Sequence, residues 1–236
     1  MTSVLSISGV LLVMLLLFYC SYSIKAGVYI KSLCRKETGE KVVALTFDDG
    51  PHQEQTPKIL EILATYGMEA AFFCIGANIE GNIALTKKID DGGHIIGNHS
   101  YCHSNGFPCF GLKRLEQDIR ECDNLIESVT GRKTNFFRPP FGVTNPIVAK
   151  AINNAGHISV GWSIRSLDTT CKGDIGRVLK RIKRQLKPGS VILLHDRLPF
   201  SDKLLTGVIE LLLKNGYRVE RIDKMFGKQR DRLCNI

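Results

Sequence analysis

Residues 41–51 combine a buried-strand pattern with an acidic turn, and this combination limits the folds that the chain can adopt. Residues 41–47 are mainly apolar and β-branched without polar alternation, as in strands of parallel sheets that are covered on both faces. Gly50-Pro51 ends the strand, so Asp48 and Asp49 follow it directly. In parallel sheets, ligands bind at the C-terminal ends of the strands. Adjacent carboxylates also repel each other unless they share a cation or a proton. The stretch therefore indicates a functional site. The alternative is that one of the two aspartates caps the following helix and the other has no role.

The rest of the chain alternates apolar strands with amphipathic helices. Strands are expected at 41–47, 70–75, 94–97, 136–138, 157–162, 190–194 and 217–222. Helices are expected at 56–66, 83–91, 112–129, 146–155, 174–186 and 203–215. This alternation predicts an α/β fold, a parallel (β/α) barrel with seven strands, one unit short of the usual eight. We expect the globular domain to span residues 41–227 and a tail to occupy 228–236.

The N-terminal segment is apolar. Residues 4–22 carry no charge, and residues 10–19 are uninterrupted and apolar. We interpret residues 1–26 as a signal peptide or a membrane anchor, which makes the membrane a partner, and residues 27–40 as a linker. The basic residues that follow favour a cytoplasmic domain by the positive-inside rule. Cleavage after Ser23 would remove that constraint, so we expect a membrane-anchored or secreted protein with an extracytoplasmic domain.

The chain is basic, with 32 lysines and arginines against 23 aspartates and glutamates, a net charge of +9. Such a balance favours anionic partners. The densest basic run, residues 177–187, also carries a helical apolar stripe, and we interpret it as a solvated helix face. The sequence has no zinc-finger spacing and no basic stretch interleaved with aromatics, so nucleic acid is not an expected partner. The eight cysteines show no Cys-x-x-Cys spacing, so disulfide connectivity stays open.

Unusual polar residues follow several of the predicted strands, all at the same end. They are Asp48 and Asp49 after the first strand, His99 and His103 after the third, Arg138 at the end of the fourth, Asp168 after the fifth and His195 after the sixth. Structural residues would scatter between both ends of a barrel, whereas catalytic residues gather at the C-terminal rim. The pattern therefore favours an active site.

Two histidines and a carboxylate predict a metal centre. His99 and His103 are four residues apart, which in a helical turn places both imidazoles on one face. With Asp49 they form a His-His-carboxylate set that leaves open positions on one divalent ion, zinc being the first choice. In a protein site the pKa of zinc-bound water falls to roughly 7, from about 9 for aqueous zinc, and Asp48 is the expected base for that water.

These residues resemble the polysaccharide deacetylase superfamily, carbohydrate esterase family four, over residues 42–222. Five ordered motifs carry the resemblance: Thr46-Phe47-Asp48-Asp49-Gly50, His99-Ser100-Tyr101-Cys102-His103, Arg138-Pro139-Pro140-Phe141-Gly142, Trp162 to Asp168, and Leu193-Leu194-His195-Asp196. The resemblance implies a distorted (β/α) barrel that hydrolyses N-acetyl, sometimes O-acetyl, groups of glycans. The expected substrate is a chitin-like oligomer, peptidoglycan or exopolysaccharide, and the sequence leaves the choice among them open because all three carry the same acetamide.

The resemblance also implies roles for individual residues. Asp49, His99 and His103 would bind the metal. Asp48 would be the base, oriented by Arg138. The backbone N–H of Phe141 would form the oxyanion hole, His195 would be the general acid, and Pro140, Trp162 and Arg165 would lie at the substrate.

The fourth motif departs from the family pattern. Where the family has an acidic residue that contacts the motif-five histidine, this chain has Arg165, and Thr169 replaces a tryptophan. We expect Arg165 to leave His195 without its partner, to lie near it and to lower its pKa, unless Asp168 substitutes as a catalytic partner. The departure motivates a second hypothesis, a membrane-tethered carbohydrate-binding module that has the fold but no turnover.

Overall fold

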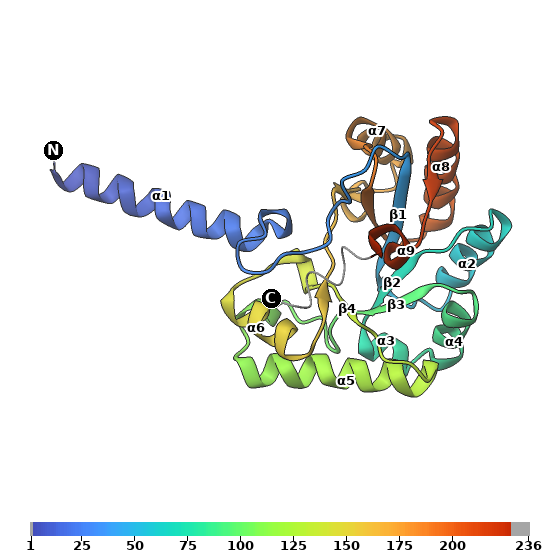
Figure 1. The fold of residues 1–236 in the computed structure, drawn as a ribbon, viewed down its shortest axis with the longest axis horizontal. Coiled ribbons are helices and arrows are strands. Elements are labelled where there is room, and N and C mark those ends of the chain that lie inside the picture. The colour runs from blue at the N-terminus through green and yellow to red at the C-terminus, as the bar shows by residue number, and fades with distance from the viewer. Residues whose placement is uncertain (1, 228–236) are drawn as a thin grey trace.

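The computed structural model describes residues 2–227, which fold around one curled parallel sheet (Figure 1). The strands are β1 Val42–Gly50, β2 Ala71–Cys74, β3 Ile95–Asn98, β4 Phe136–Phe137, β5 Ile158–Ser159, β6 Ile164–Arg165, β7 Ser190–His195 and β8 Arg218–Val219. Seven of them follow the order β5-β4-β3-β2-β1-β7-β6, and β8 pairs with the beginning of β1. The predicted distorted barrel is confirmed, and the tail at 228–236 lies outside the described residues.

The α-helices other than α1 pack around this sheet (Figure 1). The helices are α1 Thr2–Tyr22, α2 Thr56–Thr65, α3 Gly76–Glu80, α4 Ile83–Asp91, α5 Leu112–Thr130, α6 Pro146–Asn154, α7 Ile175–Gln185, α8 Ser201–Lys214 and α9 Ile222–Phe226. The strand β6 and the short helices α3 and α9 were not expected from the sequence. Each is five residues or shorter, too short for a clear hydrophobic period.

The two faces of β1 are buried in different apolar clusters, which explains its unbroken apolar sequence. Val43, Leu45 and Phe47 pack with residues of α2 and α8 in one cluster. Val42 and Ala44 point the other way and pack with Phe73 and Leu193 of the neighbouring strands, among others, in a second cluster. Because successive side chains of a strand alternate between faces, a strand covered on both sides must be apolar throughout.

The segment before β1 completes the sheet between β5 and β7. Leu33 forms a parallel bridge with Val160, just after β5, and Arg35 forms an antiparallel bridge with Ser190 of β7. The backbone of Lys36 approaches Gly189 so closely that a Cβ there would lie 1.9 Å from the Lys36 carbonyl oxygen. Residues 33–36 of the expected linker therefore pack against the domain as part of its sheet.

The N-terminal helix α1 extends away from the barrel and contacts it only near its last turn (Figure 1). There, the carbonyl of Ser21 accepts a hydrogen bond from Thr144 N–H, and Ile24 is buried just after the helix. Lys25 donates from Nζ to the carbonyl of Ser163 at 2.6 Å. No helix among residues 2–227 combines the length and hydropathy of a transmembrane span.

Candidate active site

A bulge at the end of β1 brings its two carboxylates into one cavity. Asp48 pairs with Phe73 and Gly50 with Cys74, so the register shifts at the residue between them. That residue, Asp49, has a φ of 72°, in the left-handed region that few residues other than glycine adopt. In a regular strand the two side chains would point to opposite faces. Because of the bulge, Asp48 and Asp49 both line a cavity of about 230 Å³ at the rim of the barrel.

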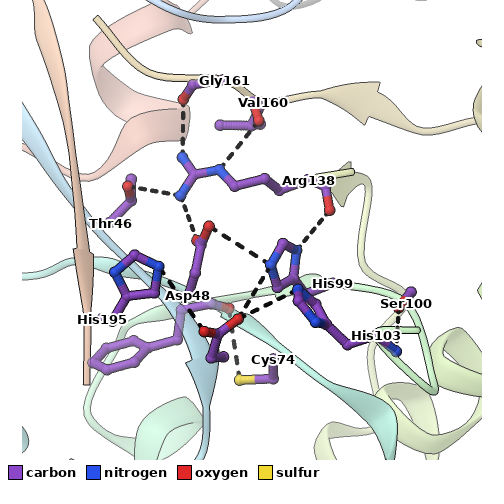
Figure 2. Close-up of polar contacts among 12 residues, drawn as sticks. Thr46, Asp48, Cys74, His99, Ser100, His103, Arg138, Val160, Gly161 and His195 are labelled. Carbon is purple, nitrogen blue, oxygen red and sulfur yellow. Dashed lines mark hydrogen bonds and ion pairs between the residues drawn. The ribbon is translucent and has the colours of Figure 1, made fainter. Parts of the chain in front are cut away.

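Asp48 is held by a fully buried arginine. Arg138 donates from Nη1 to Asp48 Oδ1 at 2.5 Å. The same guanidinium donates to the Thr46 hydroxyl and to the backbone carbonyls of Val160 and Gly161, at 2.9 to 3.2 Å (Figure 2). These bonds fix the guanidinium in place, so Arg138 orients one oxygen of Asp48 and leaves Oδ2 facing His99, whose Nε2 is 3.7 Å away.

Three side chains beside the Asp48–Arg138 pair converge as a possible metal-ligand set: Asp49, His99 and His103. Their ligand atoms all lie within 4.8 Å of one another. Asp49 Oδ1 is 3.6 Å from His99 Nε2 and 3.5 Å from His103 Nε2. Two ligands that bind one ion at about 2.0–2.2 Å lie within about 4.4 Å of each other, so the Asp49–His99 and Asp49–His103 pairs both fit a single divalent ion.

Hydrogen bonding and burial prepare both histidines as ligands. His99 Nδ1 is 2.7 Å from the backbone carbonyl of Arg138, which can only accept a hydrogen bond. Nδ1 therefore carries the hydrogen, and Nε2 keeps its lone pair for the cavity. Burial, followed by the neighbouring His99, lowers the pKa of His103 to about 4. The His103 ring is therefore neutral at neutral pH, as a ligand of a cation must be. The donor set fits a zinc-like ion.

The segment between the two histidines is a loop and not the expected helical turn. Ser100 and His103 have φ values of 67° and 44°, which no α-helix contains. Side chains replace the missing helical hydrogen bonds. Asn98 accepts from Ser100 N–H at 2.7 Å, and Asp118 of α5 accepts from the N–H groups of Tyr101 and Cys102 at 2.8 and 3.2 Å. The expected proximity of the imidazoles is thus produced by loop anchoring.

Asn98 and Asp118 were not singled out from the sequence, although Asp118 left a signal. It lies at helical spacing from Leu115 and Cys122, within the apolar stripe of α5, and is buried. A carboxylate in such a stripe needs hydrogen-bond donors, because burying it unpaired is costly. Here the loop that carries the metal ligands supplies them.

His195 lies on the opposite side of the aspartates from His99 and His103 (Figure 2). Its Nδ1 is 2.9 Å from Asp168 Oδ1, and its backbone N–H donates to Asp168 Oδ2 at 2.8 Å. Burial alone would lower the pKa of His195, but the hydrogen bond and the charge of Asp168 outweigh it and raise the pKa. Asp168 therefore takes the place of the acidic partner of His195, which is the alternative that the sequence had left open.

Arg165 lines the cavity but turns toward the N-terminal segment. Its Nη1 donates to the Tyr22 hydroxyl at 3.2 Å, and its guanidinium lies 6.0 Å from the ring centres of both Tyr22 and Trp162. The pKa of His195 is raised and not lowered as expected of a nearby cation. The carboxylates around His195 decide this shift.

The third motif supplies a tight turn beside the metal ligands. Phe141 has a φ of 60° and packs its ring 4.8 Å from that of His103, while Pro140 is buried. Gly142 lies beneath Trp162, and a Cβ there would come within 2.3 Å of the indole ring. Phe141, Gly142 and Trp162 all line the cavity. The motif therefore shapes one wall of the site.

Two further charged residues follow His195. Arg197 donates from Nε to Asp49 Oδ2 at 2.8 Å, which leaves Oδ1 to the two histidines. Burial would raise the pKa of Asp49, but the neighbouring histidines and Arg197 hold it below its usual value. Asp196 is fully buried, and burial raises its pKa to about 7. Arg197 was not singled out from the sequence, where nothing distinguishes it from a surface arginine.

Comparisons with known proteins agree with this geometry. Residues 35–160 match the polysaccharide deacetylase family. The chain belongs to this family. The peptidoglycan-N-acetylmuramic acid deacetylase of Bacillus subtilis is 33% identical to it over 224 residues, which cover 89% of this chain and 84% of the relative. A chitooligosaccharide deacetylase of Sinorhizobium fredii is 33% identical over 172 residues, 72% of this chain and 79% of that protein.

One solved structure with the same fold is described as a pseudoenzyme. A family 4 carbohydrate esterase pseudoenzyme from Bacillus anthracis matches this polysaccharide deacetylase with a TM-score of 0.77 at 27% identity, over 83% of this chain and 68% of the other. Membership of the family therefore does not by itself establish turnover. The arrangement of the side chains has to be weighed for this chain separately.

Proposed function

We propose that this polysaccharide deacetylase family member hydrolyses N-acetyl groups, and sometimes O-acetyl groups, of a glycan. The observation that carries the proposal is the convergence of three groups on one cavity: a three-ligand metal set, a buried carboxylate and a carboxylate-paired histidine. Metal-assisted hydrolysis of an amide needs these three components.

The metal set is Asp49, His99 and His103, with zinc as the first choice among divalent ions. Such an ion polarises a carbonyl oxygen and lowers the pKa of water when bound. Arg197 holds Asp49 Oδ2 and thereby directs Oδ1 toward the two imidazoles. The backbone N–H of Phe141 is the proposed donor to the oxygen that gains negative charge.

Asp48 and His195 are the proposed base and acid. Asp48 accepts the proton from water, and its bond with Arg138 keeps Oδ1 occupied so that Oδ2 is the accepting atom. His195 donates a proton to the departing amine. Its Nδ1 is bound to Asp168, so Nε2, 3.9 Å from Asp49 Oδ2, is the donating atom.

The substrate class follows from the relatives. Their names specify peptidoglycan N-acetylmuramic acid and chitooligosaccharides, and we propose an N-acetylated glycan of one of these kinds. Action on peptidoglycan would place the domain outside the cytoplasm. The binding module without turnover receives little support, because the residues for base, acid and metal are all present, and contacts of 3.5 to 3.9 Å between the histidines and the two aspartates link them.

Acetate release with controlled metal content tests this proposal. The purified protein is treated with chelator, reloaded with zinc and incubated with N-acetylglucosamine oligomers and with peptidoglycan glycan strands. We expect acetate release that requires metal and is abolished in the His99→Ala, His103→Ala double variant. Zinc binding in that variant at the wild-type stoichiometry would refute the metal set. Binding of the glycans by the zinc-loaded wild type without acetate release would instead favour the binding module.

A further inference from the structure

A cationic cavity adjoins the candidate active site. It lies between α7 and the loop that follows β6, has a volume of about 290 Å³, and is lined by Arg177, Lys180, Arg181 and Arg184. Buried Val178 and Cys171 and the hydroxyls of Ser166 and Thr170 also line it. None of the described residues lining it is acidic. The basic run therefore borders a cavity, in addition to forming the solvated face expected from the sequence.

Leu167 joins this cavity to the candidate active site. Its side chain lines both, and its φ of 61° turns the chain between them. A second link is made by arginines, since Arg181 donates from Nε to the backbone carbonyl of Arg165 at 2.7 Å. Arg165 itself lines the catalytic cavity. A bound chain of sugars that leaves the catalytic cavity over Leu167 would thus enter the cationic one.

The charges around the two cavities are unevenly paired. Each carboxylate of the catalytic cavity has a positively charged or protonatable partner: Arg138 for Asp48, Arg197 for Asp49 and His195 for Asp168. Within residues 2–227, no carboxylate lies at ion-pair distance from Arg165 or from the four cations of the second cavity. Like charges gathered without counter-charges repel, and an anionic ligand relieves that repulsion.

We propose that the cavity between α7 and the loop after β6 binds an anionic substituent of the glycan, a carboxylate or phosphate on a sugar next to the one that is deacetylated. This rests on the proposed function, which supplies the glycan and its orientation. Arginines match the planar carboxylate and the phosphate group with several N–H donors. The cavity would select acidic glycans over neutral ones.

The test compares a neutral with an anionic substrate. The neutral probe is the N-acetylglucosamine tetramer, and the anionic probe is a tetrasaccharide of alternating N-acetylglucosamine and N-acetylmuramic acid with free carboxylates. The subsite variant is Arg177→Gln, Lys180→Gln, Arg184→Gln. The control Lys183→Gln, Lys187→Gln, Lys214→Gln removes the same charge from residues outside the cavity lining. Thermal unfolding verifies that both variants fold.

We expect the ratio of kcat/KM for the anionic over the neutral probe to fall about tenfold in the subsite variant, mostly through KM, and less than twofold in the control. Raised salt should reduce the wild-type ratio as well, because partly exposed ion pairs are screened. An equal fall in both triple variants would show a general charge effect and overturn the proposal.

Calorimetric titration of the chelator-treated protein with the same two tetrasaccharides separates binding from turnover. Tighter binding of the anionic probe that is lost in the subsite variant supports the subsite even if no acetate is released from either probe, a result that would count against the proposed function alone. If inorganic phosphate binds the cavity while the two tetrasaccharides bind equally, the site serves free phosphate and the proposal is wrong.

Discussion

His195 Nδ1 lies 2.9 Å from Asp168 Oδ1, and both oxygens of that carboxylate are bound to the same residue, one by the imidazole and one by the backbone N–H. Asp168 is almost completely buried, so its charge acts on His195 with little screening by water. The pair fixes both the orientation and the protonation of the proposed acid. Its neighbour Arg165, at the position where the family carries an acid, takes no part in this contact.

The first prediction concerns this pair. In Asp168→Asn the imidazole loses the charge that raises its pKa, so the pKa of His195 should fall. His195 must be protonated to donate, and activity is lost as pH rises through its pKa. The alkaline limb of kcat should therefore move to lower pH. A kcat profile against pH that superimposes on the wild-type profile would contradict the assignment.

Arg165 provides the matched comparison. Its guanidinium is bound to the Tyr22 hydroxyl and not to His195, so Arg165→Gln should leave the alkaline limb within about 0.3 unit of wild type. KM for an anionic glycan is expected to rise instead. Both quantities come from the same set of kcat and KM measurements across pH. A limb displaced to higher pH in this variant would restore the tuning role that the sequence pattern suggested.

The acidic pair should divide its work. Asp49→Asn should weaken zinc binding, because Oδ1 faces both imidazoles. Asp48→Asn should keep the metal and lower kcat by roughly 100-fold or more, since the proton acceptor is lost. It should also destabilise the fold by about 3 kcal/mol, because the buried charge of Arg138 is left unpaired. Metal analysis, kinetics and denaturant unfolding measure these effects, and equal metal loss in both variants would refute the division.

The loop between the metal ligands should depend on α5. Asp118→Ala leaves the N–H groups of Tyr101 and Cys102 without their acceptor, which should cost about 2 kcal/mol of unfolding free energy and weaken zinc binding about tenfold. Glu121→Ala, on the exposed side of the same helix, is the control and should change stability by less than about 0.5 kcal/mol. If Asp118→Ala lowered stability but left zinc affinity unchanged, Asp118 would support only the fold, and its proposed role in positioning the metal ligands would be wrong.

The sequence by itself determined the architecture and most of the candidate site. The apolar runs at 42–47 and 190–194 and the stripe of α5 specify strands and helices locally, because burial requires apolar side chains at the period of each element. Parallel strands then bring their carboxyl ends to one rim, so Asp48, Asp49, His99 and His195 could be expected together.

Only the tertiary structure decided how those residues are oriented and what surrounds them. The bulge at Asp49, the loop held by Asp118 and the turn of Arg165 toward Tyr22 depend on hydrogen bonds between residues 16 to 143 positions apart, which leave no local period in the sequence. The contacts of Asp168 and Arg197 have the same origin. A buried polar group needs a hydrogen-bond partner, and which partner it has depends on the groups that the folded chain brings within reach.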